Sequence, residues 1–237
     1  AFLFSEGKCV MVRAEDIVAQ LPLRKSGKQS FLRDVKQYAE HLGYTVSTES
    51  GYLLIGDPKQ ARHLLSCGTA VSGVAAWLEL LRTFPENRRH KVCFILFDGK
   101  FGASSYRKNY AVESAQQLLI HLDHVGDGNH MRMYPTKQLK ADRILLTSLY
   151  RACGYFGTRD LLAEEGKKPV LLKIFTDFPY AVTICSLQPH KKAFRYPHKT
   201  KNTGMDETNV NILRAALTTY ICCGEVNLER NMKNETV

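Results

Sequence analysis

The unbroken apolar run "VCFILF" at 92–97 limits the fold more than any other stretch of the chain. A strand with apolar side chains on both faces needs cover on both faces, which parallel or mixed sheets obtain from helices. Apolar or alternating runs that end near turn residues predict further strands at 44–50, 52–57, 62–68, 119–122, 170–175 and 180–187. We therefore expect one central sheet.

Amphipathic segments lie between these strands. In "KQSFLRDVKQYAEHL" (28–42) the apolar residues recur at helical spacing, and Gly43 follows where a helix would end. Further helices are predicted at 72–84, 140–156 and 206–223. Because strands and helices alternate, we expect an α/β fold, a three-layer α/β/α sandwich with a central mixed, mostly parallel sheet. No linker or repeat divides the chain, so residues 1–237 are expected to form a single domain.

The composition is that of an ordinary globular protein, with 44% hydrophobic and 24% charged residues. No apolar run approaches the roughly 20 residues that cross a bilayer, so no membrane span is expected. Glu6 and Lys8 interrupt the opening "AFLFSEGKCVMV" too early for a signal peptide. The seven cysteines, an odd number without zinc-finger spacing, favour reduced core residues. Together these features predict a cytoplasmic location.

The chain also carries a formal net charge of +10, with basic clusters at 88–91 and 189–202. Such an excess of cations attracts nucleic acid, anionic lipid or acidic ligands. No nucleic-acid-binding module accompanies the charge, so a solvated basic face is favoured and binding to nucleic acid is the weaker alternative.

Ligands of α/β sheets usually bind beyond the carboxyl ends of the strands. The segments around Gly68, Asp98, Asp123 and His198 are therefore the places to look for functional side chains.

Taken in order, several blocks of the chain resemble those of the co-catalytic zinc aminopeptidases, the relatives of bacterial leucyl aminopeptidase and glutamate carboxypeptidase. These blocks are "LRKSGKQSFLRDVKQYAEHLGYTV", "LLSCGTAVSGVAAWLELLR", "KVCFILFDGKFGASSY", "IHLDHVGDG" and "YPHKTKNTGMDETN". The resemblance runs from about Arg24 to Cys223, and the glutaminyl cyclases share the same fold with a single zinc. It implies a mixed sheet between helices, zinc ions at the carboxyl edge, a bridging aspartate and a glutamate as general base.

The first family block departs from that pattern. Ser66, Cys67 and Gly68 stand where the family places a histidine ligand, and Thr69 falls where the bridging aspartate belongs. On this resemblance, both of those ligands are lost.

The second block departs further. In "FDGKFGASSY", Lys100 occupies the position of the general base and Phe101 that of a glutamate ligand. Neither side chain bridges metal ions, and a lysine near its usual pKa does not take a proton from a metal-bound water at neutral pH. We interpret the residues after Phe97 as an active-site turn that has exchanged its catalytic groups.

Two metal positions remain on this resemblance, Asp123 and His198. A catalytic zinc normally needs a larger set of protein ligands, with one coordination position left open for water. No cofactor is therefore expected. Zinc at a rebuilt site is the alternative, with further ligands drawn from His124, Asp127, His130 or His190.

Three further hypotheses concern residues near this edge. Cys67 is a candidate nucleophile with His198 as base, although a buried structural cysteine is the favoured interpretation. Lys100 is a candidate partner for Asp123, in place of a lost cation. The basic segment 189–202 is a candidate anion site, with Phe194 or Tyr196 as a stacking surface and cationic contacts from Lys191, Lys192, Arg195 and Lys199.

The sequence thus predicts a catalytically degenerate aminopeptidase-like protein with a binding or assembly role. The ligand expected at the former active-site cleft is a peptide or an anion. The alternative is a metal-dependent aminopeptidase whose altered zinc site is built from Asp123, His198 and nearby histidines.

Overall fold

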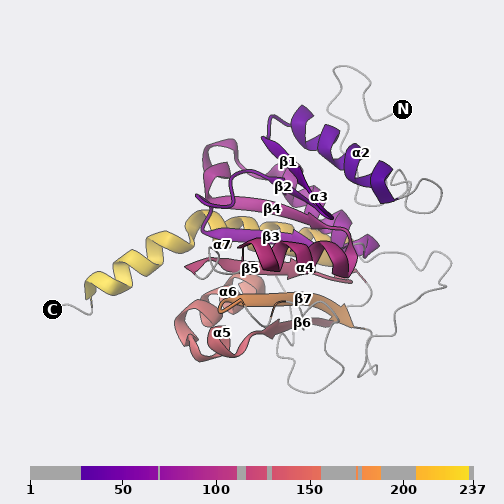
Figure 1. The fold of residues 1–237 in the computed structure, drawn as a ribbon. Helices are drawn as coiled ribbons and strands as arrows, with labels where there is room; N and C mark the ends of the chain where they lie inside the picture. Colours follow the sequence, from indigo (N-terminus) through magenta and orange to yellow (C-terminus); the bar gives the residue numbers. More distant parts are fainter. Residues whose placement is uncertain are drawn as a thin grey trace.

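The computed structural model describes residues 28–68, 70–110, 116–126, 130–155, 175, 178–187 and 207–234. Its centre is a seven-stranded sheet in the order β1-β2-β4-β3-β5-β7-β6 (Figure 1). The strands are β1 (Val46–Glu49), β2 (Tyr52–Ile55), β3 (His63–Cys67), β4 (Val92–Phe97), β5 (Leu118–Leu122), β6 (His130–Pro135) and β7 (Ala181–Leu187).

The pairing of the strands makes the sheet mixed. The central strands β4, β3, β5 and β7 are parallel to one another. Antiparallel pairs flank them, with β1 and β2 on one side and β6 on the other. The predicted α/β fold with a central mixed sheet is confirmed.

Helices pack on both faces of the sheet. They are α2 (Lys28–His41), α3 (Val71–Thr83), the 3₁₀ helix η1 (Glu86–Lys91), α4 (Gly99–Tyr110), α5 (Lys137–Ala141), α6 (Arg143–Tyr155) and α7 (Glu207–Asn234). One face buries the apolar sides of α2, α3, α6 and α7. The opposite face packs against α4, together with Phe175 and Phe178. The sheet therefore lies between two apolar layers, as the run at 92–97 requires.

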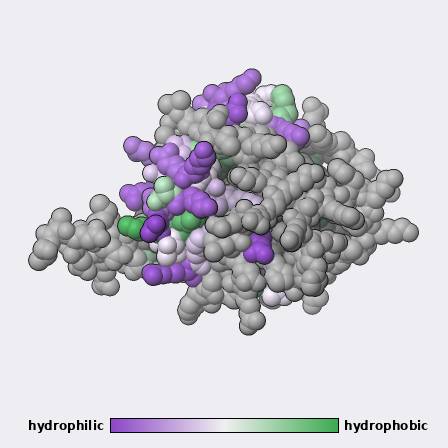
Figure 2. Space-filling model, turned by 90° about the horizontal axis from the view of Figure 1, so that it is seen from below, coloured by the Kyte–Doolittle hydropathy of each residue, from purple (hydrophilic) through white to green (hydrophobic). Residues whose placement is uncertain are grey.

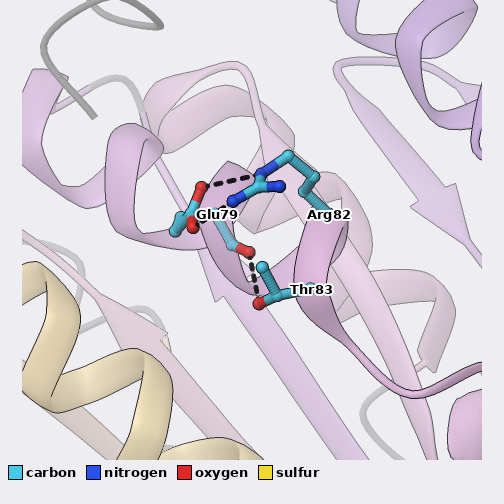
Figure 3. Close-up of polar contacts among 3 residues, drawn as sticks. All are labelled: Glu79, Arg82 and Thr83. Atoms are coloured by element: carbon cyan, nitrogen blue, oxygen red, sulfur yellow. Dashed lines mark hydrogen bonds and ion pairs between the residues drawn. The ribbon is translucent and has the colours of Figure 1, made fainter. Parts of the chain in front are cut away.

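Helix α3 is the most deeply buried of these helices, and it carries a buried carboxylate on its inner side. Glu79 pairs with Arg82 through two contacts, Nε to Oε2 at 3.0 Å and a terminal guanidinium nitrogen to Oε1 at 2.7 Å (Figure 3). The hydroxyl of Thr83 donates to the Glu79 carbonyl oxygen at 2.8 Å. The charge of Glu79 is thus balanced within the last turns of its own helix.

Most of the predicted elements are present, with small shifts at their ends. The helix expected at 140–156 is divided at Asp142, which ends α5 and whose carboxylate accepts from the Leu145 amide at 3.0 Å at the start of α6. The helix expected at 206–223 extends to Asn234. Of the strand predicted at 170–175, only Phe175 belongs to the described residues.

Three elements were not expected: the 3₁₀ helix η1, helix α4 and strand β6. The residues after Phe97, interpreted as a turn, begin helix α4 at once, and the Gly102 amide donates to the Asp98 carbonyl oxygen at 3.2 Å. Two glycines and two serines among its twelve residues give this segment little helical signal. Strand β6 was missed because it is an edge strand that ends in Pro135.

The end of the molecule that carries α5 and α6 has a basic surface. Exposed side chains there include Lys137, Lys140, Arg143 and Arg151, with Ile144 as an exposed apolar residue among them. Seen from below, hydrophilic residues on the coloured surface surround a few hydrophobic ones (Figure 2). The positive charge of the chain therefore extends beyond the basic segment 189–202, which lies outside the described residues.

Two further expectations from the sequence concern the cysteines and membrane spans. Within the described ranges, Cys67, Cys93, Cys153 and Cys185 are buried free thiols, as expected for core cysteines. In the same ranges, no helix is both long and apolar enough to cross a bilayer.

Candidate ligand site at the carboxyl edge of the sheet

The parallel strands β3, β4 and β5 bring three of the predicted segments to one edge. Gly68, Asp98 and Asp123 each follow directly after the last residue of a strand. In the register of the sheet Cys67 pairs with both Leu96 and Leu122, so the ends of the three strands lie level. Three of the four predicted segments therefore lie at one edge of the sheet.

Asp123 is held in place by its backbone. Its amide donates to the Ile184 carbonyl oxygen of β7 at 2.9 Å, and the residue is only 7% exposed. Next to it, Nε2 of His124 lies 3.7 Å from Asp123 Oδ1. The His124 carbonyl oxygen accepts from both the amide and the hydroxyl of Ser186, at 3.1 and 3.0 Å. The turn after β5 is thus tied to β7, and the backbone of Asp123 is held in place.

Helix α3 begins directly against the end of β5. A Cβ atom placed on Gly73 would lie 2.7 Å from the Leu122 carbonyl oxygen and 3.5 Å from the Cα of Asp123. No side chain fits at that distance, so only glycine allows this approach. The contact places the first turn of α3 beside Asp123.

Cys67 lies at the end of β3 and is fully buried. Burial raises the pKa of its thiol well above the usual value, and the nearby Asp123 carboxylate raises it further. A thiol in these conditions stays protonated at neutral pH, whereas a nucleophilic cysteine needs a thiolate. The geometry therefore supports the structural role, and His198, the base considered for it, lies outside the described residues.

Lys100 and Phe101 lie in the first turn of α4 rather than in a loop. Lys100 is exposed, and the predicted pairing with Asp123 does not form. Phe101 is 64% exposed, but one side of its ring rests on the backbone of Gly51, where an added Cβ would come within 2.7 Å of the ring. An apolar ring and a cation therefore stand at the edge, at the positions where the resemblance implies two glutamates.

The hairpin between β1 and β2 fixes this turn of α4. The Asp98 amide donates to the Gly51 carbonyl oxygen at 2.7 Å. Gly51 has a φ of +86° and Gly99 a φ of +55°, both in the region that favours glycine. The backbone that presents Lys100 and Phe101 is therefore set by main-chain contacts and glycine conformations, not by the two side chains.

The other predicted site residues cannot be placed. Thr69, Asp127, His190 and His198 lie outside the described residues, as does the candidate anion site with Lys191, Lys192, Arg195 and Lys199, and the side chain of His130 is not described. Among the side chains that the structure does describe, no group of three or more His, Cys, Asp or Glu residues could hold a metal ion. Asp123 and His124 alone do not fit the ligand set of a catalytic zinc.

One buried pair was not anticipated from the sequence. On the face of the sheet toward α4, Ser66 Oγ lies 3.0 Å from Nδ1 of His121. Burial lowers the pKa of His121 to about 3, and its ring contacts those of Phe97 and Phe175, at centroid distances of 6.2 and 5.2 Å. A single histidine inside the apolar run "LLIHL" was the only sequence signal for it.

Comparison with known proteins yields structural similarity only. No protein-family model matches the chain, and no curated protein matches it. Among solved structures, the glutaminyl cyclase of Porphyromonas gingivalis superposes with a TM-score of 0.68 at 13% identity, covering 88% of this chain and 94% of that one. The glutaminyl cyclase of Fimbriiglobus ruber gives 0.64 at 16% identity, covering 92% and 96%.

The aminopeptidase LapA of Legionella pneumophila is also similar, with a TM-score of 0.59 at 12% identity, covering 88% of this chain and 69% of that one. The chain has the zinc exopeptidase-like fold. At these identities the similarity establishes the fold alone.

Proposed function

We propose that this chain is a catalytically degenerate relative of the zinc aminopeptidases, which binds a peptide at the carboxyl edge of the sheet without hydrolysing it. The observation that carries the proposal is the first turn of α4. It presents an exposed cation and an exposed aromatic ring, Lys100 and Phe101, at the positions where the resemblance implies a general base and a metal ligand.

A second exposed apolar residue supports binding at this edge. Val71, the first residue of α3, is 42% exposed. Val71 begins α3, and Phe101 lies in the first turn of α4. These helices follow the neighbouring strands β3 and β4, so both residues lie at the carboxyl edge. Apolar side chains together with a lysine suit a peptide that offers an apolar side chain and a carboxylate.

The proposal is tested first by activity. Protein purified without chelator is assayed for bound metal and for turnover of aminoacyl chromogens and of peptides with an N-terminal glutamine, with and without added zinc. We expect no turnover above the buffer. Stoichiometric zinc with turnover that is lost in Asp123→Asn would replace the proposal with the second candidate, a metal-dependent aminopeptidase with an altered site.

The proximity of His124 to Asp123, with 3.7 Å between Nε2 and Oδ1, is the observation that favours this second candidate. Among the described residues, these two side chains are the ones that would belong to such a metal site. The activity assay therefore separates the two functions.

Binding is tested next, by fluorescence anisotropy with a panel of short labelled peptides that carry an apolar residue and a free C-terminal carboxylate. Lys100→Glu and Phe101→Ser should each weaken binding at least tenfold. Lys108→Glu makes the same charge change at an exposed position near the other end of α4 and serves as the matched control. Equal affinities for all of these proteins would contradict the proposed edge.

A further inference from the structure

A row of buried polar side chains crosses the parallel part of the sheet on the face toward α4. Ser66 of β3 is in register with His121 of β5, and His121 is in register with Thr183 of β7. All three residues are completely buried. Their neighbours two positions earlier on the same face, Leu64, Leu119 and Ala181, belong to the apolar core. The row is thus a polar line inside an apolar layer.

Hydrogen bonds within the described structure satisfy only some of the polar atoms in this row. Ser66 Oγ occupies one ring nitrogen of His121, with 3.0 Å between Oγ and Nδ1. His121 Nε2 and Thr183 Oγ1 are both buried and have no hydrogen-bond partner within the described structure. Buried polar atoms in folded proteins are nearly always bonded, and those that side chains leave over are commonly bonded to internal water.

The described neighbours of the His121 ring do not satisfy its Nε2. The rings of Phe97 and Phe175 flank His121, and an aromatic ring offers at most a weak acceptor. Water meets the requirement for either tautomer of the histidine, because it accepts from a protonated Nε2 or donates to a bare one. It also bonds to a threonine hydroxyl in either direction. One molecule between adjacent strands would therefore complete both groups.

We propose that His121 Nε2 and Thr183 Oγ1 form an internal binding site for a single water molecule that bridges β5 and β7. The donor set supports water over a metal ion, because one imidazole and two neutral hydroxyls lack the carboxylates or thiolates that divalent cations prefer. This site does not depend on the proposed peptide binding. The water site lies two residues before Asp123 along β5. A bridge between β5 and β7 at this point stiffens the strands that carry the carboxyl edge.

Two substitutions at Thr183 test the proposal by the sign of their effect. Thr183→Val keeps the shape and removes the hydroxyl, and Thr183→Ser keeps the hydroxyl and removes a methyl group. If water bridges the pair, the valine variant loses a bond and its melting temperature should fall by about 3 °C or more. If Oγ1 has no partner, valine removes an unsatisfied group, and an unchanged or higher melting temperature would overturn the proposal.

Thr218→Val provides the control. Thr218 lies on α7, and its Oγ1 is also buried without a hydrogen-bond partner in the described structure. Since Thr218 lies outside the row, a fall in melting temperature as large as that of Thr183→Val would show that the loss is general to buried threonine hydroxyls, and would contradict the bridge.

A crystal structure of the unaltered protein gives a second, independent measurement. We expect a solvent peak within about 2.7–3.2 Å of both His121 Nε2 and Thr183 Oγ1. That peak should disappear in Thr183→Val. A direct bond between the two side chains, or a third side chain in the same place, would overturn the proposal.

Discussion

Gly102 lies so close to Gly51 that a Cβ atom on Gly102 would stand 1.8 Å from the Gly51 carbonyl oxygen. This contact joins the β1–β2 hairpin to the first turn of α4, and the Asp98 amide reinforces it by donating to the same oxygen at 2.7 Å. The position of Lys100 and Phe101 depends on it.

Gly102→Ala should therefore destabilise the protein by about 3 kcal/mol, because either the hairpin or the helix must move to admit the methyl group. Urea denaturation measures the change. Gly99→Ala is the matched control on the same turn: its Cβ would meet nothing within 4 Å, although its φ is +55°. That strain alone costs about 1 kcal/mol. Equal losses in both variants would show that the close contact is not what matters.

For Gly73→Ala, the sign of the change in stability tests whether α3 rests on the end of β5. Alanine in a helix is normally more stable than glycine by about 1 kcal/mol. Here the added methyl group would lie 2.7 Å from the Leu122 carbonyl oxygen, and we expect a loss of about 2 kcal/mol instead. Thermal and urea denaturation both report it. A more stable variant would mean that α3 does not rest on the end of β5.

Lys100→Ala should leave the free energy of unfolding within about 0.5 kcal/mol of the parent, because the side chain is exposed and makes no ion pair with Asp123. The loss expected for Gly102→Ala, measured by the same urea denaturation, is the reference against which this small change is judged. A loss above 1 kcal/mol would restore the pairing that the sequence suggested.

Arg82→Ala should cost about 2 kcal/mol, since it leaves the buried carboxylate of Glu79 without its two guanidinium contacts (Figure 3). Combining it with Glu79→Gln removes the unbalanced charge and should recover part of the loss. If the double variant is less stable than Arg82→Ala, the charge of Glu79 is balanced by another group.

Acid should destabilise the protein through His121. Its pKa is about 3 in the folded state, against about 6.5 for an unfolded histidine. Below pH 6.5 the unfolded chain takes up a proton that the folded chain does not, so stability falls with pH until about pH 3. Between pH 7 and 5 the loss from this residue is about 2 kcal/mol. His121→Gln should flatten the profile in urea titrations, and an unchanged slope would assign the effect to other groups.

The order of strands and helices was predictable because burial on both faces leaves a continuous apolar run, as at 92–97, and burial on one face leaves a helical period, as at 28–42. Helix α4 was not predictable, because its start is determined by contacts of Asp98 and Gly102 with Gly51 of a distant hairpin, and not by local propensity. The same holds for the Ser66–His121 pair, which exists only through the register of β3 and β5.

At the candidate site, the sequence placed Asp98 and Asp123 correctly at one edge, because each follows a recognisable strand. It misjudged the relation of Lys100 to Asp123, since side-chain direction in the first turn of an unexpected helix cannot be read from chain order. The metal positions assigned to Asp123 and His198 stay predictions.

The contact between Gly51 and Gly102 also makes the fold of this turn independent of the side chains that the turn presents. Main-chain atoms alone set the helix start, so residues 100 and 101 can differ in charge and polarity at little cost in folding. A chain with this architecture can therefore carry either a lysine and a phenylalanine or two glutamates at these positions without a change of fold. The stability of such a chain carries no information about whether it is an enzyme.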